Sequence, residues 1–182
     1  MRETWFENRE LTVYRLGKDA AEDKKTIEEL ARELREEDLE EMKAAQSYYN
    51  LETRTRLNYV AESVECSELC LAARRRSDDK LICVGGLVRL NDDNLVETAP
   101  VIRLAWLMGS KHFNDNWMSV AKAVKPVLGL MINTLDWRED EERFLTNFVY
   151  CKNEKAISFL KWFGARIEDE VNGFARFWIG LE

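Results

Sequence analysis

The chain has 182 residues, of which 46% are hydrophobic and 34% charged, and its 34 acidic against 27 basic residues give a net charge of −7. This composition is typical of a globular protein with a buried core, and the length predicts one domain over residues 1–182. A membrane-spanning helix needs roughly 18 consecutive apolar residues. The most apolar stretch, residues 120–135, is interrupted by Lys122, Lys125 and Pro126. We therefore expect no membrane association.

The N-terminus and the cysteines both predict a cytoplasmic protein. The first ten residues, MRETWFENRE, lack the apolar segment of a signal peptide. The four cysteines form no CxxC pair, and the single histidine, His112, is distant in sequence from all of them, so no metal site is expected. We interpret the cysteines as buried, reduced thiols and His112 as a surface residue. The cysteines stand at positions 66, 70, 83 and 151.

The negative charge is concentrated near the N-terminus. Residues 19–41 hold eleven acidic and four basic residues, which accounts for the whole net charge of −7. Within an acidic helical segment at about 19–46, we interpret these residues mainly as a solvated helix face, and as a surface for a basic substrate or partner in the alternative interpretation. The only compact basic cluster is Arg74-Arg75-Arg76, followed by turn residues. General nucleic-acid binding is therefore not expected.

The first part of the chain predicts one strand and then helices. Apolar side chains alternate over residues 11–16, which predicts a short strand. Apolar residues then recur at helical spacing in 26–34 and 36–49, as one bent helix or two, and again in 53–63. We therefore expect helices between the first strand and the rest of the sheet.

A three-strand meander follows. Leu69, Leu71 and Ala73 alternate, residues 81–90 form a nearly continuous apolar run, and a third strand is expected over about 96–107. The apolar run is typical of a central strand buried on both faces. The pair Gly85-Gly86 within it indicates a bulge or close packing rather than a phosphate loop.

The last part predicts two helices and three strands. A long helix is expected to be capped by one of residues 114–116, with a kink or a second helix at Pro126. A strand over 143–150 follows, and then a short helix that Asn153 caps and Gly164 ends. Two closing strands are expected, joined by an Asn-Gly turn. They cover about residues 165–169 and 174–179.

These elements form an α+β arrangement, in which one mixed, mostly antiparallel sheet carries helices on both faces. Their order resembles the GNAT superfamily of N-acetyltransferases from about residue 11 to residue 180. The most specific piece is VYCKNEKAISFLKWFGA, residues 149–165. It is similar to that superfamily's late strand and helix, in which an Asn, an Ala three positions later and a helix-ending Gly recur. Residues 30–41 and 105–110 are similar to a divergent tailed-phage branch that includes internal virion proteins of short-tailed phages.

The resemblance implies acetyl-CoA as cofactor. Its pantetheine would lie between the third meander strand and the next strand, where the two splay apart, against the backbone of Leu107, Met108 and Gly109. Its pyrophosphate would bind amides of the loop that starts at Ser110 and Lys111, at a helix N-terminus. The resemblance also implies that Asn153, in the motif of residues 149–165, is a cofactor-binding residue.

The resemblance also assigns the acid and base positions. Glu97 on the meander corresponds to the base. Leu160 stands where many members carry a Tyr that protonates the leaving thiolate, and leucine has no proton to give.

The phosphate loop departs from the superfamily as well. It reads Ser-Lys-His-Phe-Asn-Asp-Asn over residues 110–116 and lacks the paired glycines, while Asp115 adds a charge that repels phosphate. Proximity alone can still carry much of an acyl transfer. Two hypotheses follow: acetyl-CoA-dependent N-acetyl transfer to an amine, or a catalytically degenerate phage protein of virion assembly or host interaction.

Overall fold

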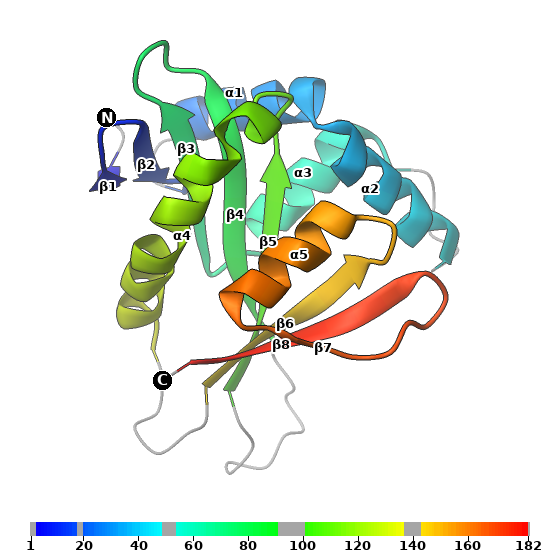
Figure 1. Ribbon diagram of the computed structural model, residues 1–182. Coiled ribbons are helices and arrows are strands. Elements are labelled where there is room, and N and C mark those ends of the chain that lie inside the picture. Colours follow the sequence, from blue (N-terminus) through cyan, green and yellow to red (C-terminus); the bar gives the residue numbers. More distant parts are fainter. Residues whose placement is uncertain (1–2, 18–19, 49–53, 91–100, 137–142, 182) are drawn as a thin grey trace.

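The computed structural model describes residues 3–17, 20–48, 54–90, 101–136 and 143–181 (Figure 1). The described residues form five helices and eight strands. In chain order they are β1 (Glu3–Glu7), β2 (Leu11–Arg15), α1 (Ala20–Glu33), α2 (Glu36–Tyr48), α3 (Arg56–Glu65), β3 (Leu69–Arg75), β4 (Leu81–Arg89), β5 (Val101–Gly109), α4 (Phe113–Thr134), β6 (Arg143–Tyr150), α5 (Glu154–Phe163), β7 (Arg166–Ile167) and β8 (Phe174–Leu181).

All eight strands belong to one sheet with the order β1-β2-β3-β4-β5-β6-β8-β7. Neighbouring strands are antiparallel except β5 and β6, which pair in parallel. Helices α4 and α5 cover one face of the sheet, and α1, α2 and α3 cover the other (Figure 1). The predicted α+β class, with a mostly antiparallel sheet between two helical layers, is confirmed.

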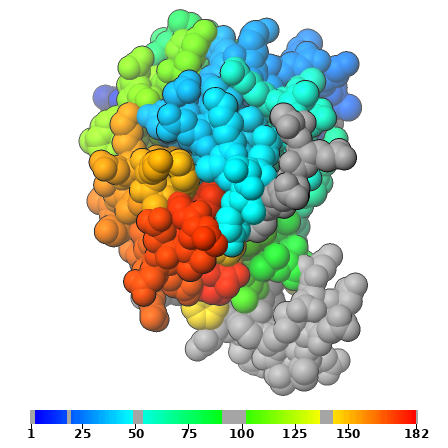
Figure 2. All heavy atoms as spheres, turned by 90° about the vertical axis from the view of Figure 1, so that its right-hand side faces the viewer, coloured from blue at the N-terminus to red at the C-terminus, as the bar shows by residue number. Residues whose placement is uncertain are grey.

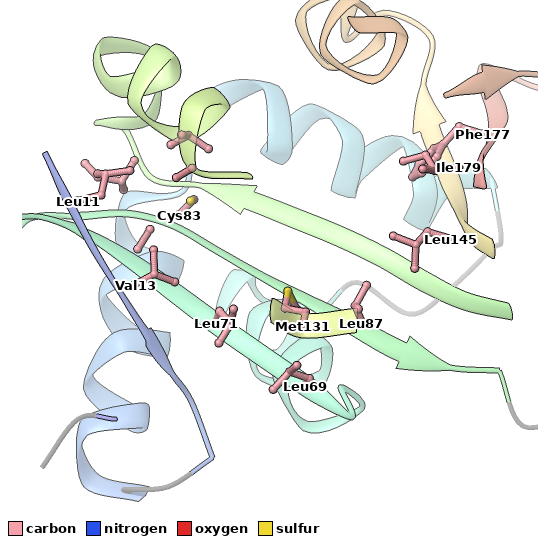
Figure 3. Packing of buried hydrophobic residues seen from close by; sticks show 14 of the residues in the cluster. Leu11, Val13, Leu69, Leu71, Cys83, Leu87, Met131, Leu145, Phe177 and Ile179 are labelled. Atoms are coloured by element: carbon pink, nitrogen blue, oxygen red, sulfur yellow. The ribbon is translucent and has the colours of Figure 1, made fainter. Parts of the chain in front are cut away.

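Each face of the sheet has its own hydrophobic core because strand side chains alternate. Leu71 and Ala73 of β3 pack on the α4 side, whereas Cys70 and Ala72 pack against α1 and α3. In β4, Ile82 belongs to the first of these cores. Both strands are central and buried on both faces, as the continuous apolar run predicts. Figure 3 shows the core on the α4 side.

The glycine pair of β4 lies where neighbouring groups come close. A Cβ added at Gly85 would stand 2.9 Å from Trp106 O, and one added at Gly86 would stand 2.6 Å from Ser67 Oγ. Of the two predicted interpretations, the structure shows close packing. The indole of Trp106 donates to Ser67 Oγ (2.9 Å) beside Gly86.

Helix α4 starts earlier than predicted. His112, not one of residues 114–116, is the N-cap, and its side chain makes no capping hydrogen bond. The helix continues through Pro126 to Thr134, so the predicted split into two helices does not occur. No helix among the described residues is both long and apolar enough to cross a membrane.

The late motif has the predicted local structure. Asn153 Oδ1 accepts a hydrogen bond from Ala156 N (3.2 Å) and caps α5, and Gly164 ends the helix with a φ of 99°. Asn172 and Gly173 both have positive φ, as the turn before β8 requires. Strand β1 was not predicted, because its alternation is too short to be recognised in the sequence.

Two surface predictions need correction. Asp38 lies in the acidic segment but is only 7% exposed, so this part of α2 is not a solvated face. Cys66 is exposed, whereas Cys70 and Cys83 are buried as expected. Burial raises the pKa of Cys83 to about 12, so its thiol is unreactive at neutral pH.

Candidate active site

The two parallel strands separate halfway along their length. Their register runs from Val101 opposite Arg143 to Leu104 opposite Thr146 and ends there, although β5 continues to Gly109 and β6 to Tyr150. At the point of separation, Asn147 Nδ2 donates to Ala105 O (3.0 Å) and Asn147 Oδ1 accepts from Phe148 N (2.8 Å). A wedge-shaped gap therefore opens beyond Asn147.

Leu107 presents its main chain to this gap. Ser110 N donates to Ile82 O (2.9 Å), so even-numbered residues at this end of β5 point their main-chain groups toward β4. Successive residues of a strand direct these groups to opposite sides, which places the N–H and C=O of Leu107 on the β6 side. Within the described ladder no strand pairs with Leu107 there. This is an extended backbone site open to an amide-containing chain.

Gly109 has its main-chain groups occupied by the α1–α2 junction. Its N–H donates to Asp38 Oδ2 (2.7 Å), and its carbonyl accepts from Arg35 N (3.0 Å). Arg35 also binds Asp38 through Nε (2.7 Å) and Nη2 (2.8 Å) and lies 4.4 Å from the Phe113 ring centroid. Burial raises the pKa of Asp38, and these hydrogen bonds to its carboxylate oppose the rise.

The amides of the loop before α4 are also used internally. Ser110 N donates to Ile82 O, Lys111 N to Glu33 O (2.6 Å), His112 N to Ser110 Oγ (3.2 Å) and Phe113 N to Ser110 O (2.9 Å). A phosphate at a helix N-terminus needs such amides free. In this conformation the amides of residues 110–113 are bound to protein acceptors.

The Glu33 carboxylate lies beside two side chains of the same loop. Glu33 lies 2.9 Å from Lys111 Nζ and 3.6 Å from His112 Nε2. Burial alone would raise the pKa of Glu33, but the hydrogen bond and charge of Lys111 leave it below the ordinary value. His112, which was predicted to lie at the surface, is partly exposed.

Glu37 connects α2 to the first turns of both α4 and α5. Its Oε1 accepts from Lys155 Nζ (2.9 Å) and from Asn114 Nδ2 (3.2 Å). The hydrogen bond from Lys155 lowers the pKa of Glu37 to about 2. Figure 2 shows the blue and cyan α2 segment lying against orange α5, in agreement with this ion pair. Acidic residues of α1 and α2 therefore lie against the loop that is predicted to bind an anion.

Glu41 is a carboxyl at the gap with a strongly raised pKa. It lies one turn beyond Asp38 on α2 and is half-buried beside Tyr59 of α3. Burial raises its pKa to about 7, and the negative charge of Asp38 adds to the rise. Asn153 Nδ2 donates to its Oε2 at 3.5 Å. A carboxyl with this pKa exchanges a proton readily near neutral pH, which suits a general base.

The α4 side of the gap is apolar. Trp117 of α4 and Trp162 of α5 are 54% and 55% exposed, and Lys125 Nζ lies 5.3 Å from the Trp162 ring centroid. Both tryptophans line a single pocket that also includes Leu107 and Asn147. Within the described residues, no group of three or more His, Cys, Asp or Glu side chains could hold a metal ion.

Solved structures of similar fold are named as GNAT domains or as acetyltransferases. The GNAT domain of S. lividans PAT has a TM-score of 0.62 at 13% identity, with 94% of this chain and 90% of that chain covered. The chain has the GNAT fold. A GCN5-related N-acetyltransferase from Brucella melitensis has a TM-score of 0.58 at 13% identity, with 99% and 80% covered.

A third GNAT-fold structure, an acetyltransferase from Bacillus anthracis, has a TM-score of 0.54 at 12% identity, with 100% of this chain and 98% of that chain covered. No protein-family model matches the sequence, and no curated protein matches it either. The likeness is thus one of fold.

The GNAT fold brings several of the predicted site residues to one place. Leu107, Met108, Gly109, Ser110 and Lys111 follow one another along the edge of the gap, and Asn153 lies across it at the start of α5. Three of these residues already have protein partners. The main chain of Met108 pairs with β4, Ser110 Oγ donates to Leu81 O, and Lys111 Nζ binds Glu33. Glu97 lies outside the described residues.

Sequence reasoning missed Glu41, Asn147 and the role of Asp38. Glu41 and Asp38 were part of an acidic run that has the appearance of a solvated helix. Burial separates them from the other acids, and the only sequence signal was the apolar pair Leu39 and Met42 on the buried side of α2.

Proposed function

We propose that this protein is an acyltransferase that moves an acyl group from a thioester donor, with acetyl-CoA as the simplest one, to an amine. The observation that carries the proposal is the position of the Glu41 carboxyl at the gap between β5 and β6, together with its pKa of about 7. The names of the GNAT-fold neighbours support acyl transfer as the reaction class. On the α2 side of the gap, Asp38 is paired with Arg35, so the Glu41 carboxyl is the group that can accept a proton from a cationic amine.

The Leu107 main chain offers one N–H donor and one C=O acceptor to the amide groups of a pantetheine arm, which would lie along β5 as an added strand. Asn153 would not contact the donor in this arrangement. Its bond to Glu41 instead fixes the carboxylate orientation. Asn153 is therefore a positioning residue in this proposal.

The chemical step uses Glu41 as the base. Its carboxylate takes a proton from the ammonium group of the acceptor, and the neutral nitrogen attacks the thioester carbonyl carbon. The C–S bond then breaks as the C–N bond is completed, and the nitrogen gives up its second proton to water. The sulfur leaves as a thiolate and takes a proton from water, because Leu160 cannot supply one and a thiol with an ordinary pKa of about 8.5 is a competent leaving group.

A second candidate function follows from the internal hydrogen bonds of the loop before α4. The amides of residues 110–113 and the carboxylates of Glu33 and Glu37 leave little to hold a pyrophosphate. A protein that keeps the fold without turnover is the alternative, and the resemblance of residues 30–41 and 105–110 to the tailed-phage branch would give it a role in virion assembly or host interaction. Glu97 remains the alternative base if the protein is an enzyme.

The test is release of free thiol from acetyl-CoA by the full chain in the presence of a polyamine, a lysine-containing peptide and an amino sugar. We expect release with at least one amine. Glu41→Gln should lower the rate by about 10²–10⁴-fold, while the matched variant Glu40→Gln, at an exposed position of the same helix, should not. Absence of both acetyl-CoA binding and thiol release would favour the second candidate.

A further inference from the structure

The pocket at the gap extends far beyond the space that an acetyl group needs. Its volume is about 1390 Å³, and its walls include Leu107 and Asn147 at the gap as well as Val13 of β2 and Ala73 of β3. Pockets that bury a drug-sized ligand have volumes of about 300–1,000 Å³. Part of this space lies between the sheet and α4, since residues of β2, β3 and α4 line the pocket.

The reach of this pocket across the sheet can be estimated from the strand order. From β5 through β4 and β3 to β2 there are three strand spacings, which amount to roughly 14 Å. Figure 3 shows Leu11 and Val13 at one end of the core and Leu145, Phe177 and Ile179 at the other, on the same face of the sheet. All five residues line the pocket.

The geometry points to an acyl-chain pocket: the donor carries a medium-length aliphatic acyl group, which lies between α4 and the sheet while its thioester carbonyl lies at the gap. This inference rests on the proposed acyl transfer and specifies its donor. The acetyl group, with one methyl, would leave the space beneath α4 empty.

The chemistry of the walls favours hydrocarbon over water or a polar ligand. The pocket residues contributed by β2 and β3 are Leu11, Val13, Leu71 and Ala73, and those facing them from α4 include Val120 and Met131. A cavity with such walls stays dry and takes up apolar ligands. Each methylene buried there should tighten binding about fourfold.

The hydrogen bonds of the loop before α4 give a second reason to expect a long acyl chain. Since the amides of residues 110–113 hydrogen-bond to protein atoms, the nucleotide end of the donor contributes little to binding. Affinity must then come from the rest of the donor, and the acyl chain is the part for which the pocket provides surface.

The experiment is calorimetric titration of the full chain with acetyl-, hexanoyl- and decanoyl-pantetheine, which lack the nucleotide. We expect affinity to rise with chain length, by more than tenfold from hexanoyl to decanoyl. Ala73→Leu narrows the far end of the pocket and should weaken decanoyl binding more than tenfold while leaving acetyl binding unchanged. Ala72→Leu is the matched control, because Ala72 is the neighbouring residue of β3 and packs on the opposite face.

Either substitution can impair folding, since both alanines are buried. Hydrogen exchange on the wild type avoids this problem. Decanoyl-pantetheine should slow exchange along α4 more than acetyl-pantetheine does.

The outcomes separate the two proposals. Equal affinity for decanoyl and acetyl, with thiol released to an amine, would overturn the acyl-chain pocket and keep the acyltransferase. Tight decanoyl binding without any transfer would keep the pocket and overturn the acyltransferase. Failure of all three thioesters to bind would overturn both.

Discussion

Asn153 joins the end of β6 to Glu41 of α2. Its Oδ1 accepts from Ala156 N and caps α5, while its Nδ2 donates to Glu41 Oε2 at 3.5 Å. One side chain thus caps α5 and orients the Glu41 carboxyl, whose pKa is raised to about 7.

Substitution of Asn153 should separate these two roles. Asn153→Ala removes both and should lower the free energy of unfolding by about 0.5–2 kcal/mol through the lost cap. Asn153→Asp keeps the cap but brings a second carboxylate toward Glu41, which should raise the Glu41 pKa further and shift the pH profile of thiol release upward. Urea unfolding and pH–rate profiles of the two variants measure these effects. If the free energy of unfolding of Asn153→Ala is close to that of the wild type, the cap does not contribute to stability.

Glu41 should make stability depend on pH in a defined direction. Its pKa rises from 4.5 to about 7 on folding, so between these values the folded state binds the proton that the unfolded state has released. The stability gained from this proton is full below pH 4.5 and is lost as the pH rises to about 7. Glu41→Gln should therefore become more stable than the wild type at pH 8 by about 1–3 kcal/mol, with no such gain at pH 4.

Urea midpoints at pH 4, 6 and 8 measure this effect, with Glu40→Gln as the control at an exposed position. If the stability difference between Glu41→Gln and the wild type is the same at all three pH values, the Glu41 pKa is not raised by folding.

Glu33 should compete with an external phosphate for the loop before α4. Glu33→Gln leaves the main-chain bond from Lys111 N but frees Lys111 Nζ and His112 from a carboxylate. Coenzyme A affinity should rise about two- to fivefold at low salt, and Lys111→Ala should cancel the gain. Calorimetric titration is the measurement, and Glu28→Gln, exposed on the same helix, is the control. Weaker binding in Glu33→Gln would place the phosphate elsewhere.

The whole chain should unfold as one domain. Among the described residues, the meander of β3, β4 and β5 is joined to β6 and β8 through the parallel pairing at Val101–Leu104, the hydrogen bond from Asn147 to Ala105 and the helical layers. Amides of β4 and β6 should therefore share one free energy of exchange. Native-state hydrogen exchange in low denaturant tests this, and two separate free energies would indicate two units.

The sequence by itself determined the local structure wherever short-range chemistry is sufficient. The run of residues 81–90 requires burial on two faces, Asn153 and Gly164 mark the ends of α5, and Asn172-Gly173 allows the last turn. These features depend on side-chain period, capping and backbone freedom, all of which act within a few residues. The order of such elements was enough to indicate the fold.

Only the tertiary structure decided which charged residues belong to the site. Along the sequence, Glu40 and Glu41 are equivalent acids on one helix, yet only Glu41 lies at the gap, where Asn153 from more than a hundred residues away reaches it. Likewise, nothing in the sequence of residues 109–113 shows that Asp38 binds the Gly109 amide and that Glu33 binds Lys111. Burial and the charge environment set a pKa, and both arise from contacts between segments that are distant in the chain.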